Sequence, residues 1–278
     1  MRDLEGRVAV VTGGGSGIGR ATALALADRH VSVAIADLDA GRADAVAAEV
    51  DAQGSAGLGL RCDVTSGADL AAVRDAVLER FGRVDIVMNN VAVISLGLPT
   101  DIPFEEWQRA VAVNLLSIVA SNEVFLPLLI DQGSGHVVNT ASTAGLYGYD
   151  VSRLPYAATK SAVVGLSEGL ALFLAPLGVG VTCLCPGPVR TNIAESVRVF
   201  GHPQLRGPAL ELIEPEVVGR QVVGAIEDGT FLLLTHPEVH EILVRRAEDP
   251  EGFLAGQLAH LWGDGSGAAT TGTGLASD

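Results

Sequence analysis

The sequence predicts an α/β fold of the doubly wound class, in which helices cover both faces of a mostly parallel, seven-stranded sheet. Short apolar runs alternate with segments of helical period from Arg7 to about Leu234. The runs are continuous and rich in β-branched residues, which is typical of strands buried on both faces. A glycine-rich stretch lies between the first run and the first helical segment.

Each run predicts one strand, and each segment with apolar residues about 3.6 positions apart predicts one helix. Pro155 fits a first helical turn, because the N–H that proline lacks has no partner there. The strands are predicted at residues 7–12, 31–36, 58–62, 84–88, 136–140, 179–184 and 231–234. The helices are predicted at residues 18–29, 42–53, 68–81, 104–129 and 156–177.

Residues 1–235 are expected to form a single nucleotide-binding and catalytic domain. Within it, residues 188–213 contain proline and glycine without a strong period, and we expect a flap over the site. Residues 236–262 read as a helical extension of two short helices. The small, polar residues 263–278 are predicted to be disordered.

Composition limits the function. A formal charge of −15 disfavours nucleic acid and anionic membrane surfaces as partners. No uninterrupted apolar run reaches the roughly 18 residues of a membrane span, and the N-terminus lacks a secretion signal, so a cytoplasmic protein is expected.

The three cysteines, Cys62, Cys183 and Cys185, lack a disulfide framework and are predicted to be reduced. We expect Cys183 and Cys185 to face opposite sides of their strand as ordinary core residues. No metal is expected, because the pair His236 and His240 lacks the glutamate of an H-E-x-x-H site.

The first predicted strand ends in T-G-G-G-S-G-I-G, residues 12–19, and a helical pattern follows at once. Glycines allow a sharp turn and close approach to a pyrophosphate, which the free N–H groups and the dipole of a helix N-terminus would bind. The sequence therefore predicts a Rossmann-type dinucleotide site at this turn. Its residues are Gly13, Ser16, Gly17, Ile18 and Gly19.

Asp37 ends the second strand, where a carboxylate can accept hydrogen bonds from an adenosine ribose and would repel a 2′-phosphate. NAD is therefore favoured over NADP. The alternative for Asp37 is a helix N-cap, a role that Asp39 could fill equally well. Asp63, with Val64 beside it, is a candidate for the adenine amino group, and Asn90 falls where the strand order should reverse.

Tyr156 and Lys160 stand four residues apart in Y-A-A-T-K, which places them on one helix face. Lys160 is the only lysine in the chain, beside seventeen arginines. An ammonium near a phenol favours the phenolate and should lower the pKa of Tyr156 from about 10 toward working pH. The alternative is an exposed Tyr–Lys pair without a catalytic role.

With these residues in view, the chain resembles the single-domain branch of the short-chain dehydrogenase/reductase family over about residues 4–191. The likeness depends on motifs in the family's order rather than on any one of them. They are T-G-G-G-S-G-I-G, C-D-V, N-N-V-A, V-N-L, N-T-A-S-T-A-G, Y-A-A-T-K and P-G-P-V-R-T.

The resemblance implies a catalytic group of Ser142, Tyr156, Lys160 and Asn114. Tyr156 would be the general acid/base and Ser142 a hydrogen-bond donor to the substrate oxygen. Asn114 would hold a water that relays protons from Lys160; its alternative is a polar residue that caps a helix bend. Ser142 has Thr140 and Thr143 as local competitors. Beside the nicotinamide, the resemblance places Pro186, Gly187, Val189 and Thr191.

Three departures from the family's pattern leave the substrate open. Val91 and Ala92 stand where alanine and then glycine are expected, and the spacing from Ser142 to Tyr156 is about one residue longer. The usual C-terminal motif, T-G-x-x-x-x-V-D-G-G, is absent.

The resulting hypothesis is an NAD-dependent oxidoreductase that transfers a hydride between nicotinamide and a neutral, lipophilic secondary alcohol or its ketone. The alternatives are an NADP-linked ketone or thioester reductase and a non-catalytic NAD-binding regulator. The family also suggests a homotetramer, or a dimer, built by helices 104–130 and 156–177. The expected apolar substrate pocket consists of Leu96, Leu146, Tyr147, Tyr149, Val151, Ile193 and Phe200.

Overall fold

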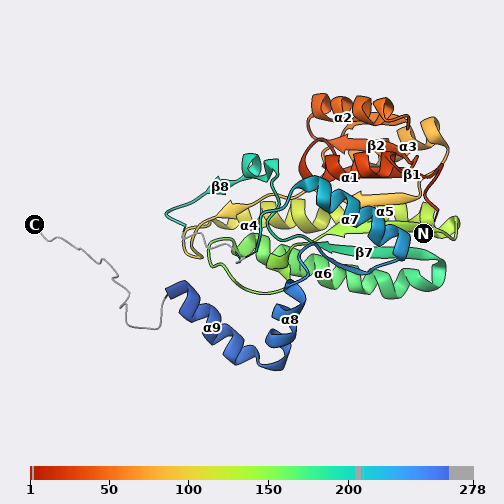
Figure 1. Ribbon diagram of the computed structural model, residues 1–278. Helices are drawn as coiled ribbons and strands as arrows, with labels where there is room; N and C mark the ends of the chain where they lie inside the picture. Colours follow the sequence, from red (N-terminus) through yellow and green to blue (C-terminus); the bar gives the residue numbers. More distant parts are fainter. Residues whose placement is uncertain (2, 204–207, 209, 263–278) are drawn as a thin grey trace, which may run out of the picture.

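A central sheet of seven parallel strands organises the chain, as predicted (Figure 1). The computed structural model describes residues 1, 3–203, 208 and 210–262. The strands are β1 (Val8–Thr12), β2 (Ser32–Asp37), β3 (Gly57–Arg61), β4 (Ile86–Asn89), β6 (Gly135–Thr140), β7 (Val179–Cys185) and β9 (Leu232–Leu234). Their order is β3-β2-β1-β4-β6-β7-β9.

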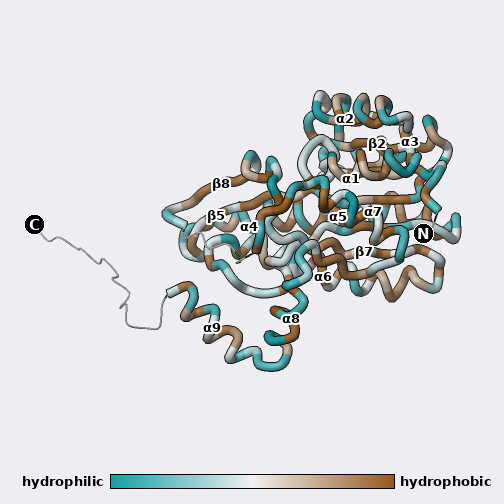
Figure 2. The backbone as a smooth tube through the Cα atoms, in the orientation of Figure 1, coloured by the Kyte–Doolittle hydropathy of each residue, from teal (hydrophilic) through white to brown (hydrophobic). Residues whose placement is uncertain are grey.

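Two apolar layers form on the two faces of the sheet because successive strand side chains point to opposite sides. In β1, Ala9 and Val11 join one cluster, whereas Val8 and Val10 join the other. The strands are accordingly apolar along their length (Figure 2). On the first face lie α1 (Gly17–Ala27), α2 (Ala40–Ala52) and α7 (Pro215–Asp228). On the second lie α3 (Gly67–Phe81), α5 (Ser117–Asp131) and α6 (Leu154–Leu174).

Three features of the fold are not in the sequence prediction. Helix α7 is one of them. A second is a small parallel pair, β5 (Ser95–Leu96) with β8 (Arg198–Val199). The third interrupts the predicted helix 104–129, in which α4 (Phe104–Val111) passes through a π-helical turn, η1 (Ala112–Leu116), into α5. Two-residue strands and single π-turns leave almost no periodic signal in a sequence.

Cys183 and Cys185 are buried core residues with free thiols, as predicted, but the prediction that they face opposite sides of the strand is wrong. Their Sγ atoms lie 3.8 Å apart, and both side chains are fully buried. Residues i and i+2 of a strand share a face, so the two thiols lie side by side under α6.

The helical extension consists of α8 (Val239–Glu248) and α9 (Pro250–Trp262), which reach away from the sheet and its covering helices (Figure 1). Val239 is buried, whereas α9 has no buried residue. Residues 263–278, predicted to be disordered, lie outside the described residues, as does part of the predicted flap.

Two helical stretches, 104–131 and 154–177, are long and apolar enough to cross a membrane by length and composition alone. This is weak evidence, because core helices pass the same test. Here Phe125 and Leu129 of the first stretch, and Leu174 of the second, are buried against the sheet.

A buried carboxylate, Asp85, joins the edge of β1 to the start of β4. It accepts hydrogen bonds from the Val8 N–H (3.0 Å) and from the guanidinium groups of Arg7 and Arg83. Burial opposes its ionisation, but these partners outweigh burial and hold the pKa of Asp85 below its ordinary value.

We expect Asp85→Ala to lower the free energy of unfolding by about 2–3 kcal/mol, because it leaves the Val8 N–H without a partner. Since the folded-state pKa is depressed, the contribution of Asp85 is present above its unfolded pKa and is lost as pH falls through the folded value. Urea unfolding of both proteins at pH 7 and pH 3 measures this. A difference in stability that does not shrink at low pH would contradict the assignment.

Candidate active site

The candidate site lies at the carboxyl ends of the central strands, where the order reverses between β1 and β4. Asn90, directly after β4, spans this crevice. Its Nδ2 donates to the Gly13 carbonyl (3.3 Å), and its Oδ1 accepts from the Thr140 hydroxyl (3.3 Å). Asn90 thus connects the turn after β1 to the end of β6.

The turn after β1 needs glycine for two reasons. Gly13 and Gly17 adopt left-handed conformations, with φ of +62° and +52°. A Cβ at Gly19 would lie 2.2 Å from the Gly13 carbonyl oxygen, so only glycine lets α1 begin this close to the turn. Ser16 stands at the N-cap position of α1, and no side chain caps that helix start. Its free N–H groups suit an anion.

Asp37 is not the N-cap of the following helix. Asp39 fills that role and accepts a hydrogen bond from the Arg42 N–H. Asp37 instead reaches back to the turn, where its Oδ2 accepts from the Gly15 N–H (2.9 Å). The carboxylate therefore stands beside the turn, at the predicted ribose position.

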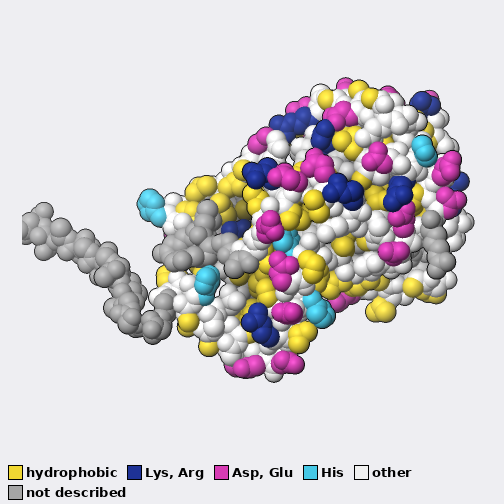
Figure 3. Space-filling view, viewed as in Figure 1, with side chains coloured by type: hydrophobic (Ala, Val, Ile, Leu, Met, Phe, Trp, Pro, Cys, Tyr) yellow, Lys and Arg dark blue, Asp and Glu magenta, His cyan; other side chains and the backbone are white. Residues whose placement is uncertain are grey.

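Three arginines surround the same turn. A cavity of about 340 Å³ is lined by residues of the turn together with Arg20, Arg42 and Arg190. Each of these arginines forms an ion pair: Arg20 with Glu49, Arg42 with Glu195, and Arg190 with Glu214. Arginine and acidic side chains alternate over this side of the surface (Figure 3). Asp37, in contrast, accepts from the Gly15 N–H of the turn and forms no arginine ion pair among the described residues.

Asp63, the predicted adenine partner, uses Oδ1 to accept from the N–H and hydroxyl of Thr65. Val64 beside it is buried.

Lys160 is almost completely buried, and its Nζ donates to the Thr140 carbonyl at 2.6 Å. The same Nζ lies 5.7 Å from the ring centre of Tyr156, so the two side chains share a helix face as predicted. Burial lowers the pKa of Lys160 from 10.5 to about 8. No carboxylate among the described residues forms an ion pair with it, which is a costly arrangement for a structural lysine.

The predicted lowering of the tyrosine pKa is not found. Burial raises the pKa of Tyr156 to about 12, and the Ser142 hydroxyl only partly opposes the rise. The Lys160 ammonium points to the Thr140 carbonyl and lies over the ring face, which explains why it does not offset burial.

Ser142 lies directly after β6. Its hydroxyl accepts from the Ala144 N–H (3.1 Å) and is within 3.5 Å of the Pro186 carbonyl. Of its two local competitors, Thr140 directs its hydroxyl to Asn90. The Ser142 hydroxyl acts to lower the pKa of the Tyr156 phenol, which favours Ser142 as its partner.

Asn114 lies fully buried in the π-turn. Its Oδ1 accepts from the Val93 N–H (2.8 Å), and its Nδ2 donates to the Val93 carbonyl and the Thr159 hydroxyl. These contacts match the alternative role, in which a polar side chain secures a helix irregularity. A relay role stays a prediction.

The segment after β7 meets the glycine turn from the other side. A Cβ at Gly17 would lie 3.1 Å from the Thr191 side chain. Val189 forms a parallel bridge with Ile213, and the Gly187 N–H donates to the Thr235 hydroxyl (3.1 Å). The Pro186 carbonyl accepts from the Thr143 N–H (2.9 Å). These contacts hold residues 186–191 beside the predicted pyrophosphate position at the glycine turn and beside the predicted nicotinamide position.

Five of the seven predicted substrate residues fall into two groups. Leu146, Tyr147 and Tyr149 cluster with Tyr156. Leu96 and Phe200 meet instead at the small β5–β8 pair, where the Phe200 N–H donates to the Leu96 carbonyl (2.7 Å). Neither Val151 nor Ile193 belongs to an apolar cluster in the described part of the chain.

Sequence reasoning missed the residues that the extension brings to the site. Ile242 and Phe253, from α8 and α9, pack into the cluster that holds Tyr156. His236 is buried, with Nδ1 near the Thr235 hydroxyl and Nε2 near the Glu211 carbonyl, both at 2.8 Å. No motif marks Ile242 or Phe253, because their position follows from where α8 and α9 pack, and the sequence pattern presented His236 only as a candidate metal ligand.

Fold and site together define an α/β protein with a dinucleotide crevice and a Ser–Tyr–Lys group. The chain belongs to the short chain dehydrogenase family, whose model matches residues 7–200. A D-threitol dehydrogenase of Mycolicibacterium smegmatis is 35% identical over 76% of this chain and 80% of its own length. A 3beta-hydroxysteroid dehydrogenase of Eggerthella lenta is 30% identical over 94% of this chain and 95% of its own.

Among solved structures, a short chain dehydrogenase/reductase from Burkholderia phymatum in complex with NAD is similar, with a TM-score of 0.82 and 34% identity. The match covers 90% of this chain and 96% of that one. The family assignment and the Rossmann-type fold are thereby confirmed, and membership supports an oxidoreductase that uses a nicotinamide cofactor.

Proposed function

We propose that this protein is an NAD-dependent alcohol dehydrogenase or ketone reductase that acts on neutral, lipophilic secondary alcohols or their ketones. The observation that carries the proposal is the convergence of Tyr156, Lys160 and Ser142 at the crevice formed by the glycine turn. A buried lysine that forms no ion pair with any described residue, next to a half-buried phenol, is unfavourable for stability, so this arrangement favours a catalytic role.

The residues at the crevice fit a dinucleotide. Gly13 and Gly17 leave room for close approach, the start of α1 suits a pyrophosphate, and Asp37 suits the adenosine ribose. Asn90, Lys160 and the segment 186–191 would hold the nicotinamide end. When bound, NAD would accept the hydride from the substrate carbon.

In the oxidation direction, Tyr156 takes the hydroxyl proton of the alcohol as its C–H bond breaks. Ser142 donates a hydrogen bond to the substrate oxygen. The Lys160 ammonium, 5.7 Å from the Tyr156 ring centre, would attract the phenolate as it forms, although in the resting site it does not offset burial. Its lowered pKa of about 8 allows it to exchange a proton near neutral pH. Asn114, through Val93 and Thr159, keeps the π-turn in place behind the lysine. In reduction, Tyr156 returns the proton.

A panel of secondary alcohols and ketones, followed by the absorbance of reduced nicotinamide, tests this function. We expect turnover with NAD and alcohols that have apolar substituents. No turnover with either NAD or NADP, despite binding of the dinucleotide, would instead support a non-catalytic regulator. A preference for NADPH and thioesters would support the other alternative.

We expect Asp37→Ala to reduce the ratio of kcat/KM with NAD to kcat/KM with NADP by roughly ten- to a hundredfold. The substitution removes the ribose acceptor and the charge that would repel a 2′-phosphate, while Arg20 and Arg42 remain close. Steady-state kinetics with both cofactors measures the ratio. Asp39→Ala is the matched control, because it removes a carboxylate at the helix cap and should leave the ratio near wild type.

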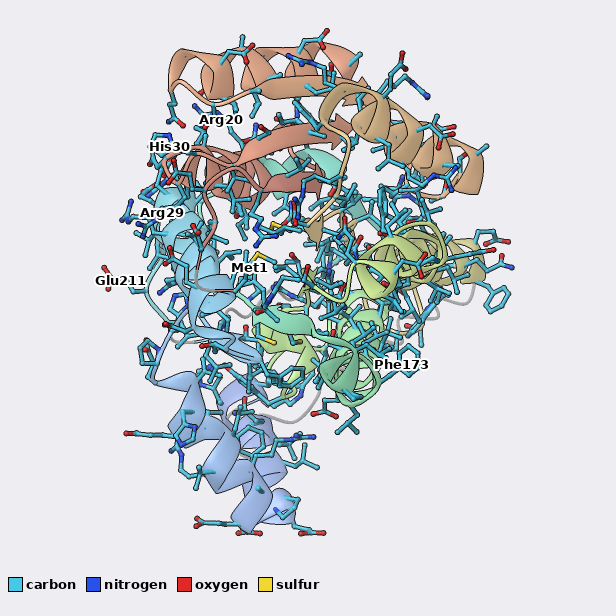
Figure 4. The ribbon with its side chains drawn as sticks, turned by 90° about the vertical axis from the view of Figure 1, so that its right-hand side faces the viewer. Met1, Arg20, Arg29, His30, Phe173 and Glu211 are labelled. Atoms are coloured by element: carbon cyan, nitrogen blue, oxygen red, sulfur yellow. The ribbon has the colours of Figure 1, made fainter. Side chains whose placement is uncertain are left out.

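The oligomer and location remain proposals. Leu116 and Val119, at the start of α5, and Leu172 and Phe173 on α6 are large, exposed apolar residues, compatible with a homotetramer or dimer. Phe173 lies on the outer side of α6 (Figure 4). Sedimentation of wild type and Phe173→Glu would test the contact. A cytoplasmic location is proposed from the reduced cysteines.

A further inference from the structure

A second cavity, of about 600 Å³, separates the helical extension from the loop that leads to Tyr156. Tyr147 and Tyr149 line it on the side of the loop. Ile242 of α8 and Phe253 of α9 line it on the side of the extension. Its volume is that of a small-molecule site, and its lining combines an apolar, aromatic part with charged and polar residues.

The cavity shares its wall with the candidate active site. Tyr147 packs against Tyr149, with ring centres 5.3 Å apart, and edge-on against Phe253 at 6.2 Å. Tyr149 and Tyr156 belong to the same apolar cluster. A ligand whose reacting carbon lies at Tyr156 would therefore extend toward the cavity along this aromatic wall.

One polar group in this wall has no partner. The Tyr147 hydroxyl is buried and makes no hydrogen bond with any described residue. Burial raises the pKa of Tyr147 to about 12, so the phenol keeps its proton and can donate. An unpartnered buried hydroxyl is unfavourable unless a ligand supplies the acceptor.

The charges at the cavity do not favour an anionic ligand. Arg245 lines it, but so do the carboxylates of Glu248 and Asp249. One cation therefore faces two anions, and a neutral ligand meets less repulsion there than a carboxylate or phosphate would.

We propose that α8 and α9 complete a distal substrate subsite for elongated aromatic or polycyclic alcohols and their ketones. A second, neutral oxygen at the far end of the substrate accepts a hydrogen bond from Tyr147. This subsite rests on the proposed function, since it places the reacting carbon at Tyr156. The subsite would give α8 and α9 a function in binding the substrate, which is separate from the formation of the central sheet.

Gly256 allows the cavity to be filled without disturbing its wall. It lines the cavity, and a Cβ built on it meets no atom within 4 Å. Gly256→Leu should therefore project into the cavity, and replacing glycine within a helix favours folding. Ala255→Leu is the matched control, because Ala255 is an exposed neighbour on α9 outside the cavity lining.

The probes are 1-phenylethanol, 1-(biphenyl-4-yl)ethanol and the 4′-hydroxy derivative of the latter. In Gly256→Leu we expect the ratio of kcat/KM for the biphenyl alcohol to that for phenylethanol to fall at least tenfold. In Ala255→Leu the ratio should stay at the wild-type value. Equal ratios in all three proteins, or an equal fall in both variants, would overturn the subsite.

Tyr147→Phe tests the hydrogen bond, because it retains the ring and removes only the hydroxyl. We expect its KM for the hydroxylated biphenyl alcohol to rise about tenfold relative to that for the unsubstituted one. An unchanged ratio of the two KM values would show that Tyr147 does not read a remote oxygen.

Calorimetric titration with 4-phenylphenol distinguishes failure of the subsite from failure of the proposed function. Binding by wild type and Ala255→Leu, with at least tenfold weaker binding by Gly256→Leu, would support the cavity even if none of the alcohols turned over. Turnover of all three alcohols with no difference in 4-phenylphenol binding between the two leucine variants would reject the subsite and retain the enzyme.

Discussion

Tyr156→Phe should reduce kcat for oxidation of a secondary alcohol by about a thousandfold, because it removes the group that takes the hydroxyl proton. Ring packing against Tyr149 and the extension is retained, so the fold and the binding of NAD should be unchanged. Stopped-flow measurement of hydride transfer and fluorescence titration of NADH separate the two effects.

The pH profile gives a second readout of the same residue. Since burial raises the pKa of Tyr156 to about 12, the phenol is protonated over the neutral range, and wild-type oxidation should accelerate as pH rises. The residual activity of Tyr156→Phe should lack this dependence. Tyr149→Phe is the matched control, a neighbouring phenol that should keep the wild-type profile. A variant at position 156 with near wild-type kcat would refute the mechanism.

Lys160→Met should lower kcat at least about a hundredfold and, at the same time, make the protein more stable at pH 7. Burial lowers the pKa of Lys160 from 10.5 to about 8, equivalent to about 3 kcal/mol of destabilisation of the charged form. The hydrogen bond to Thr140 that the variant loses is worth about 1 kcal/mol. A net gain of about 2 kcal/mol in the free energy of unfolding is therefore expected.

The sign of the pH dependence follows from the same shift. Between pH 8 and 10.5 the unfolded chain holds a proton on Lys160 that the folded chain has released. The free energy of unfolding of the wild type should therefore rise over this range relative to that of Lys160→Met. The difference in free energy of unfolding between the two proteins should become smaller. Urea unfolding at pH 7.5 and pH 10 measures it. A variant that is less stable than wild type at pH 7.5 would show that Lys160 is structural.

The variant Lys160→Arg tests whether the site requires an ammonium at position 160 or accepts any positive charge. A guanidinium is a rigid, planar fork, whereas the ammonium at Lys160 makes one short hydrogen bond in a closed space. We expect the arginine variant to fold with reduced stability and to show little activity. Full activity in this variant would mean that only the positive charge matters.

The resemblance and the glycine turn predicted the family and the dinucleotide crevice, and the Tyr–Lys spacing correctly placed both side chains on one helix face. Local chemistry explains this success, since a buried strand, a tight turn and a helix each leave a periodic or compositional signal. Cys183 and Cys185 share a face because side chains two residues apart in a strand point the same way, so their spacing already contains this information. The domain boundaries and the roles of the site residues stay predictions.

Local patterns in the sequence identify the residues that can do chemistry: one lysine near one tyrosine, a glycine turn and an acid at the end of a strand. The chemical behaviour of these groups depends on the packing around them. Burial, which depends on distant elements, raised the pKa of Tyr156 and lowered that of Lys160. Residues far apart in the chain, Tyr147 and Phe253, were brought together around a cavity. Such contacts depend on where α8 and α9 pack against the loop before Tyr156, and short-range sequence patterns contain no information about that packing.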